Sequence, residues 1–525
     1  MKILASDKLA KEGLDLLKKS GFQAEMITGL AEDELCKIIG EYDALVVRSE
    51  TKVTAKIIEA GKKLKIIARA GVGVDNVDLN AATKKGIIVV NSPGGNTEAA
   101  AEHTFAMLLS LVRHIPQARA SLKECKWERS KFKGIELYQK TLGLVGLGKI
   151  GARVAEFALS FNTRVIAYDP FVTEERAKAM GVELYKDLDS LLKEADFISF
   201  HIPKNKETAG LINKDKIKLM KKGVRLVNCA RGGIIVENDL LEALQSGQVG
   251  GAALDVFDKE PCTDSPLAQL ENVIAVPHLG ASTEEAQFNV AIDVVEQIID
   301  VLKGGQARSA VNIPSMKPEV INKVKPFMPL AEKLGILAGN LAQGAIQSVA
   351  ISYFGQTAEN EVAPLTIAVL KGMLSGILEE SVNYVNAPVI AKERGLDISE
   401  TKNAKSDFAN LISIKIKTEK GQREVGGVIS GTLGEHLVSI DNLRVEAVPQ
   451  GYMLILSNID KPGMIGKVGT LLGQHKVNIA GMDVGRIKQN EKAVMVLNID
   501  APVDKKVLEA LTKIEGIFEA VAVKF

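Results

Sequence analysis

Cysteine is scarce in this sequence, with four residues among 525, and no CxxC pair or metal-ligand spacing joins them. This scarcity argues against a disulfide framework or a metal site and is typical of a reducing compartment. No apolar stretch approaches the length of a membrane span, and the N-terminus lacks the apolar core and cleavage site of a signal peptide. We therefore expect a cytoplasmic protein without a membrane partner.

An excess of charge of either sign is also missing. Lys and Arg together number 66, against 65 Asp and Glu. A balanced chain without a polybasic tract gives no reason to expect nucleic acid as a partner, so small molecules and further copies of the chain are favoured. Aromatic residues make up only 4%, and the single tryptophan, Trp127, stands among charges. We expect Trp127 to lie in a contact between subunits of a homo-oligomer, either a dimer or a tetramer.

The order of expected elements predicts α/β architecture. Short apolar strands alternate with helical segments over 1–97 and again over 98–282, a pattern typical of two doubly wound parallel sheets. Residues 97–113 read as a helix that leaves the first sheet, and 283–305 as a long helix that completes the first domain.

The C-terminal part has a different pattern. Residues 306–449 predict an α+β domain with helices near 318–341 and 363–378 and strands such as 411–419 and 423–433. Residues 450–525 read βαββαβ, a ferredoxin-like fold. We therefore expect four domains.

A glycine-rich turn marks a dinucleotide site. The run TLGLVGLGKIG places Gly146, Gly148 and Gly151 between an apolar strand and a helix, and the next strand ends in Asp169. Glycines here allow a tight turn, a close approach to pyrophosphate and close helix packing, while the acid meets the ribose hydroxyls. Because an acid at that position repels a 2′-phosphate, we expect NAD as the cofactor.

Three chemically distinct side chains end successive apolar runs in the second half of this domain. NCARGG presents Arg231, ALDVFDKEP presents Glu260, and VPHLGAS presents His278. Arg binds a carboxylate bidentately, His exchanges a hydroxyl proton, and Glu beside His favours imidazolium. The three residues are the groups needed to oxidise a 2-hydroxy acid.

Strand ends in the first domain carry further candidates. Arg48 and Ser49 follow one strand, and the segments 69–74 and 91–96 follow two others. Ligands of doubly wound sheets bind at such carboxyl ends. We expect Arg48 and Arg69 to hold an anion and Ser49, Gly73 and Asn96 to line the substrate site.

These motifs resemble the D-isomer-specific 2-hydroxyacid dehydrogenases, through RAGVGVDNVDL, GLGKIG with YDP, NCARGGI, ALDVFDKEP and PHLGAS over roughly residues 1–305. VVRSETKV, RHIPQA and a C-terminal module similar to ACT domains resemble the long branch that acts on 3-phosphoglycerate and has an intervening domain. The resemblance implies NAD-dependent oxidation of that substrate with Arg231, Glu260 and His278 catalytic, and it adds Arg113 to Arg48 and Arg69 as phosphate ligands.

The resemblance also implies cofactor and effector contacts. The cofactor contacts fall on Val72, Gly146, Gly148, Lys149, Ile150, Gly151, Asp169, His201, Cys229, Ala230, Arg231, Asp255, His278, Leu279, Gly280 and Ala281. The ACT-like module implies L-serine as an effector, with Asn458, Asp460 and Asn478 as the matching candidates.

Two alternatives stay open from the sequence. One is a related reductase of glyoxylate, hydroxypyruvate or glycerate type, which shares every catalytic residue. The other is a dinucleotide-sensing corepressor on the same fold, since fold alone does not establish catalysis.

Overall fold

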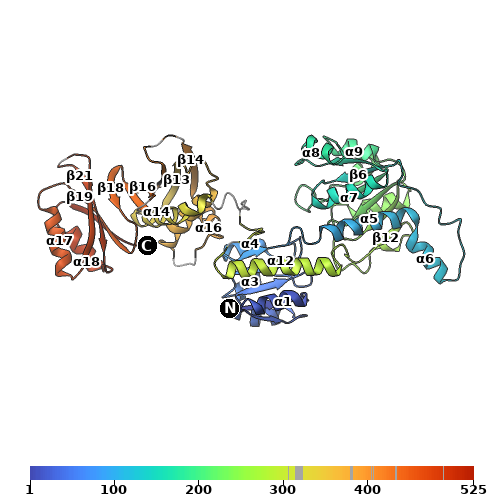
Figure 1. The fold of residues 1–525 in the computed structure, drawn as a ribbon, viewed down its shortest axis with the longest axis horizontal. Coiled ribbons are helices and arrows are strands. Elements are labelled where there is room, and N and C mark those ends of the chain that lie inside the picture. The colour runs from blue at the N-terminus through green and yellow to red at the C-terminus, as the bar shows by residue number, and fades with distance from the viewer. Residues whose placement is uncertain are drawn as a thin grey trace.

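The structure is a computed structural model that describes residues 1–305, 307–313, 323–378, 382–403, 405, 407–431, 434–488 and 490–525. Four domains lie along its long axis. From left to right in Figure 1 they are the fourth, the third, the first and the second domain. Among the described residues, no helix has both the length and the hydropathy needed to cross a bilayer.

The first domain contains a five-stranded parallel sheet in the order β2-β1-β3-β4-β5. Its central strand β3 reads ALVV and is buried throughout, because helices cover both faces of the sheet. The strands are β1 (Lys2–Ala5), β2 (Gln23–Met26), β3 (Ala44–Val47), β4 (Ile66–Arg69) and β5 (Ile88–Val90). The helices are α1 (Lys11–Lys19), α2 (Glu32–Ile38), α3 (Ala55–Ala60) and α4 (Leu79–Lys84).

The second domain has a seven-stranded parallel sheet in the order β12-β11-β10-β9-β6-β7-β8. The strand order reverses beside β6, and a crevice for a ligand forms at such a switch point. The strands are β6 (Thr141–Val145), β7 (Arg164–Tyr168), β8 (Glu183–Leu184), β9 (Phe197–Phe200), β10 (Val224–Asn228), β11 (Val249–Leu254) and β12 (Val273–Ala275). The helices are α6 (Ile115–Lys123), α7 (Lys149–Ser160), α8 (Glu174–Ala179), α9 (Leu188–Glu194), α10 (Lys214–Leu219) and α11 (Glu237–Gln245).

Two long helices connect these domains. α5 (Thr97–Arg113) leaves the first sheet and packs in the core of the second domain, through side chains such as Phe105 and Leu108. α12 (Glu284–Leu302) leaves the second domain and packs against α1 and β4 of the first. The chain therefore crosses between the domains twice.

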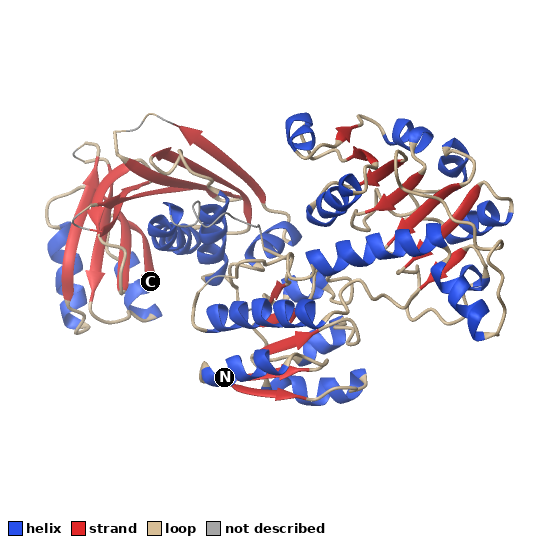
Figure 2. Cartoon of the chain, turned by 45° about the vertical axis from the view of Figure 1, so that its right-hand side comes forward, coloured by secondary structure: helices blue, strands red, loops and turns tan. Residues whose placement is uncertain are grey.

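The third domain packs two helices closely on one face of a six-stranded sheet (Figure 2). A Cβ on Gly335 or Gly372 would overlap the backbone of the opposite helix, so glycine permits this contact. The helices are α14 (Met328–Leu341), α15 (Ala363–Ser375) and α16 (Ala387–Glu393). The strands are β13 (Ile346–Gly355), β14 (Asp397–Asn403), β15 (Asn410–Thr418), β16 (Gly421–Ser430), β17 (Gly434–Ile440) and β18 (Leu443–Ala447). Parts of two elements expected from sequence, 318–322 and 432–433, lie outside the described residues.

The fourth domain has the βαββαβ order expected from the sequence and an antiparallel sheet in the order β20-β21-β19-β22. Its elements are β19 (Tyr452–Ile459), α17 (Met464–Gln474), β20 (Ile479–Arg486), β21 (Lys492–Ile499), α18 (Lys505–Thr512) and β22 (Ile517–Lys524). One face of the sheet, including Met453 and Val496, shares a hydrophobic core with Leu330 and Leu334 of α14. The third and fourth domains therefore form one packed unit.

Candidate active site

The loops after β11 and β12 bring an acid and an imidazole together. His278 Nδ1 lies 2.7 Å from Glu260 Oε2, and Glu260 Oε1 accepts the Phe257 N–H at 3.0 Å. The hydrogen bond to Glu260 raises the pKa of His278 against the opposing effect of burial. Burial raises the pKa of Glu260, but bonds from His278 and Phe257 outweigh it and leave that pKa below its ordinary value. Since Nδ1 is engaged, Nε2 is the ring nitrogen free to exchange a proton.

A buried carboxylate fixes the loop that carries His278. Asp255 Oδ1 accepts the Leu279 N–H at 2.6 Å, and its Oδ2 accepts the Gly280 N–H at 2.9 Å. The side chain of Asp255 is fully buried, and His103 Nε2 of α5 lies 3.2 Å from Oδ1. Burial raises the pKa of Asp255, but His103 and the two N–H donors outweigh this effect and keep it below its ordinary value. His103 was not identified from the sequence, because the helix that carries it reads only as a connection.

Arg231 crosses from the second domain to the loop after β4. Its Nε donates to Asp75 Oδ2 at 3.1 Å, and its carbonyl accepts from Asn228 Nδ2 at 2.9 Å. A Cβ on Gly73 would lie 2.0 Å from the Arg231 guanidinium, so the end of the arginine would have to move if residue 73 had a side chain. The structure therefore brings Gly73 and Arg231 together, as the sequence predicts for the substrate site. Asp75 belongs to the RAGVGVDNVDL motif but was not singled out as a contact.

Three arginines, Arg48, Arg69 and Arg231, lie close together near the carboxyl ends of β3 and β4. Burial lowers the pKa of Arg69 to about 10, and the positive charges of Arg231 and Arg48 lower it as well. Because these positive charges repel one another, a bound anion stabilises the cluster. Among the described residues, Arg69 Nε and the side-chain oxygens of Ser92 and Asn96 are buried without a hydrogen-bond partner.

The remaining substrate candidates, Ser49, Asn96 and Arg113, lie at different distances from the first sheet. Ser49 is exposed next to Arg48 at the end of β3, and Asn96 precedes α5. Arg113 ends α5, which at 1.5 Å per residue places it about 24 Å along the helix from Thr97. Arg113 therefore lies far along α5 from Asn96, and its contact with the substrate phosphate stays a prediction.

The glycines before α7 meet the geometric demands of a dinucleotide turn. Gly146 has φ 99°, and a Cβ there would lie 2.6 Å from the His201 carbonyl. A Cβ on Gly151 would lie 2.2 Å from the Gly146 carbonyl. Gly148 faces open space, and α7 begins after it without a side-chain cap. Backbone N–H groups of Lys149 and Ile150 are thus left for an anion at the helix N-terminus, which fits the pyrophosphate of NAD.

Asp169 ends β7 beside this turn. Its Oδ2 accepts the Leu147 N–H at 2.8 Å and its Oδ1 the Phe171 N–H at 2.9 Å. The carboxylate therefore holds the glycine turn to the second strand, where ribose hydroxyls arrive in this fold.

Other predicted cofactor contacts follow the carboxyl ends of strands, Val72 after β4, His201 after β9 and Cys229 after β10. The carbonyl of Val72 accepts from Asn91 Nδ2 at 2.6 Å. Desolvation lowers the pKa of His201 to about 4, so His201 is neutral at physiological pH. Burial raises the pKa of the Cys229 thiol to about 12. Ala230 follows Cys229 in the turn after β10, and Ala281 follows the loop that Asp255 holds.

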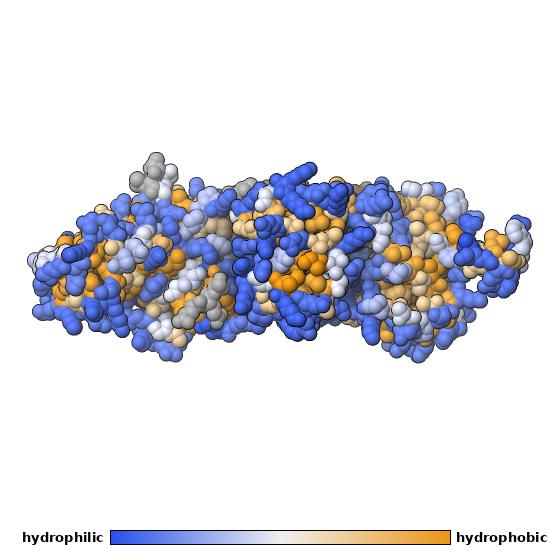
Figure 3. All heavy atoms as spheres, turned by 90° about the horizontal axis from the view of Figure 1, so that it is seen from below, coloured by the Kyte–Doolittle hydropathy of each residue, from blue (hydrophilic) through white to orange (hydrophobic). Residues whose placement is uncertain are grey.

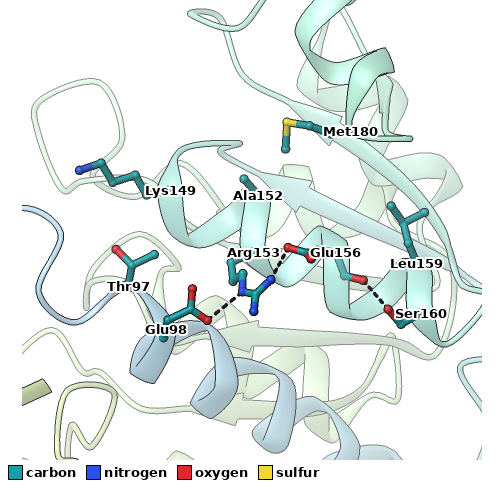
Figure 4. Close-up of a pocket in the computed structure, with 9 residues that line it drawn as sticks. All are labelled: Thr97, Glu98, Lys149, Ala152, Arg153, Glu156, Leu159, Ser160 and Met180. Carbon is teal, nitrogen blue, oxygen red and sulfur yellow. Dashed lines mark hydrogen bonds and ion pairs between the residues drawn. The ribbon is translucent and has the colours of Figure 1, made fainter. Parts of the chain in front are cut away.

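A separate hollow, with a volume of about 550 Å³, is lined by the first residues of α5, by α7 and by Met180 (Figure 4). Arg153 projects between Glu98 and Glu156 there and binds both carboxylates. Lys149 lies at one end of the hollow, on the side of the glycine turn. Because paired carboxylates line it, this hollow does not suit a pyrophosphate, and the Glu98–Arg153 bond instead fastens α5 to α7.

The effector candidates lie at opposite ends of the fourth sheet, with Asn458 and Asp460 at the end of β19 and Asn478 at the start of β20. Asp460 is paired with Arg486, and Asn478 Nδ2 donates to Asp500 Oδ2 at 2.7 Å. Asn458 donates to the Ile459 carbonyl, while its Oδ1 is buried and, among the described residues, unpaired.

A doubly wound dinucleotide domain, a facing domain that supplies arginines, and a His–Glu pair between them define a nicotinamide-dependent dehydrogenase of 2-hydroxy acids. Residues 105–280 match the family model described as D-isomer specific 2-hydroxyacid dehydrogenase, NAD binding domain. Residues 323–441 match the D-3-phosphoglycerate dehydrogenase intervening domain, and 452–516 match the ACT domain.

Full-length relatives make the assignment more specific. The chain is 50% identical to a D-3-phosphoglycerate dehydrogenase of Synechocystis sp., over all of this chain and 94% of that one. It is 45% identical to that of Archaeoglobus fulgidus, over all of both chains. It is similar to the solved structure of an Aquifex aeolicus D-lactate dehydrogenase complexed with NAD and lactic acid, with a TM-score of 0.51 and 32% identity over 58% of this chain and 96% of that one. The chain therefore belongs to the D-3-phosphoglycerate dehydrogenase family.

Proposed function

We propose that this enzyme oxidises 3-phosphoglycerate to 3-phosphohydroxypyruvate with NAD, the first step of the phosphorylated route to serine. The observation that carries the proposal is the arginine cluster of Arg48, Arg69 and Arg231 at the edge of the His278 site. A substrate with a carboxylate at one end and a phosphate at the other needs two cationic anchors. The full-length relatives of that name support the same substrate.

The residues act on a substrate held in the crevice between the first two domains. Arg231 binds the carboxylate, and the α-hydroxyl proton passes to His278 Nε2 as the C–H bond of the same carbon breaks. When bound, NAD accepts the hydride. Glu260 stabilises the imidazolium that results, because its carboxylate already accepts the Nδ1 hydrogen. Orientation and charge placement are the contribution of the protein.

Replacing Glu260 with Gln tests the electrostatic part of this relay. Oxidation requires neutral His278, so turnover rises with pH through the pKa of that residue. Glu260 raises this pKa, and its removal lowers it. The acid limb of the kcat profile should therefore move to lower pH in Glu260→Gln. A profile that stays in place would show that Glu260 only shapes the loop.

Arg48→Ala tests the phosphate anchor. The Arg48 guanidinium has only a long 3.5 Å bond to the Lys8 carbonyl, and no carboxylate among the described residues pairs with it. A hydrogen bond to a charged group contributes about 1.5 to 3 kcal/mol, so KM for 3-phosphoglycerate should rise roughly 10- to 150-fold. D-Glycerate, which lacks the phosphate, should lose little. Arg394→Ala, an exposed arginine of the third domain, is the control, and equal losses for both substrates would make Arg48 structural.

We also propose that copies of the chain associate through the second domain. Trp127 is 82% exposed, and Ile115 and Leu122 of α6 are more than half exposed. Apolar residues reach the surface at the right-hand end of Figure 3, where Figure 1 places α6. Large exposed apolar groups of this kind favour a contact with another subunit.

L-Serine is the proposed effector of the fourth domain. Asn478 is exposed and held by Asp500 at the start of β20, and Asn458 offers an unpaired buried oxygen, among the described residues, at the opposite end of the sheet. The proposed site therefore lies between two paired copies of this domain. Asp460 must exchange Arg486 for the amino group of the ligand.

The effector site is tested with Asn478→Ala. We expect the serine concentration for half-inhibition to rise roughly 10-fold or more, as loss of one hydrogen bond to a charged ligand implies, while kcat without serine is unchanged. Gln474→Ala, an exposed residue of α17, is the control. If calorimetry shows no serine binding to the intact protein, the proposal is wrong.

A further inference from the structure

Three side chains that ligate metals meet beneath the loop that carries His278. They are His103 of α5, Cys229 after β10 and Asp255 after β11, and their ligand atoms all lie within 4.8 Å of one another. The three residues are separated by 126 and 26 positions in the chain. No spacing rule applied to the sequence finds such a cluster, because the sheet and the crossing helix assemble it.

The cluster is held in place before any ion binds. Asp255 is fixed by the N–H groups of Leu279 and Gly280, which use part of the lone-pair capacity of its carboxylate. Within the described part of the chain, His103 Nε2 is buried and makes no hydrogen bond of good geometry, although Asp255 Oδ1 is 3.2 Å away. An imidazole nitrogen and a carboxylate oxygen thus face each other across a short gap.

The donor set suits zinc, as does the one short distance within it. Zn²⁺ prefers four tetrahedral ligands from Cys, His and carboxylate groups, with bonds of about 2.0 to 2.3 Å. Such bonds place nitrogen and oxygen ligands about 3.3 Å apart, close to the 3.2 Å between His103 Nε2 and Asp255 Oδ1. Three protein ligands leave a fourth position for water.

We propose that His103, Cys229 and Asp255 bind one Zn²⁺ in the enzyme without cofactor, and that this ion excludes NAD. The thiol of Cys229 coordinates as thiolate, and its proton leaves to solvent. Exclusion follows because Cys229 and Asp255 are also expected cofactor contacts, so ion and cofactor occupy the same place. The exclusion of NAD rests on the proposed function, whereas metal binding does not.

Co²⁺ is the probe for the site, because a Co²⁺–thiolate bond absorbs in the near ultraviolet and tetrahedral Co²⁺ absorbs in the visible. The intact protein, freed of metal, should bind one equivalent of Co²⁺ with both absorptions, and Zn²⁺ should abolish them. Cys229→Ser should lose the thiolate band, and His103→Leu should weaken binding at least tenfold. Cys262→Ser, also in the second domain, is the matched control and should keep both bands. No thiolate band in the intact protein, or the same band in Cys229→Ser, would overturn the site.

Competition with NAD is measured on the same signal. Saturating NAD should weaken Co²⁺ binding at least tenfold, and Zn²⁺ should raise the apparent KM for NAD without changing kcat. If Co²⁺ binds equally well with NAD present, the ion and the cofactor do not share a site, and the proposed exclusion of NAD is wrong. An inactive protein that still shows the Co²⁺ bands would contradict the proposed function alone, so the two failures are separable.

Discussion

His278→Ala is expected to lower kcat for 3-phosphoglycerate oxidation by about 10² to 10⁴-fold, the usual contribution of a general acid or base. The alanine variant lacks the group proposed to take the hydroxyl proton, while the glycine turn and Asp169, the proposed cofactor contacts, stay in place. NAD affinity, measured by fluorescence titration, should therefore change little.

His475 provides the control for this variant. It lies exposed at the end of α17, and His475→Ala should leave kcat unchanged. An unchanged rate in His278→Ala would show that His278 does not take the hydroxyl proton, whatever the geometry of the His278–Glu260 pair.

Arg231→Ala should reduce kcat/KM by a similar or larger factor. A bidentate pair between Arg231 and the substrate carboxylate provides two charge-assisted bonds, each about 1.5 to 3 kcal/mol. Their loss corresponds to roughly 10² to 10⁴ in kcat/KM. Because every 2-hydroxy acid has a carboxylate, 3-phosphoglycerate and D-glycerate should lose equally, in contrast to Arg48→Ala.

Arg231→Lys separates charge from geometry. Lysine retains the positive charge but not the planar pair of donors, so it should recover only part of the lost activity. Full activity in Arg231→Lys, or a loss confined to the phosphorylated substrate, would contradict the assignment of Arg231 to the carboxylate.

The sequence predicts much of the site because motif residues there are fixed by local backbone needs. Gly146 requires a positive φ, and Gly151 has no room for a Cβ, so the glycine spacing of the motif already carries this geometry. The βαββαβ order of the fourth domain is likewise local. Its hydrophobic runs alternate with turns at distances that a single pass along the chain detects.

Contacts between distant segments are what the sequence does not predict. His103 reads as one polar residue on an apolar helix, and only the crossing of α5 beside β11 places it against Asp255. Arg113 stands at the far end of the same helix, and its contact with the substrate phosphate stays a prediction. The core shared by α14 and the face of the fourth sheet is also a property of assembly.

The central claim is that the crevice accepts a phosphorylated 2-hydroxy acid and oxidises it with NAD. A steady-state assay of the intact protein with NAD and 3-phosphoglycerate, compared with D-glycerate and D-lactate, tests this claim most directly. We expect NADH formation with a kcat/KM for 3-phosphoglycerate at least tenfold above that for D-glycerate, as the anchor at Arg48 implies. A preference for an unphosphorylated acid, or NAD binding without turnover of any of the three, would contradict it.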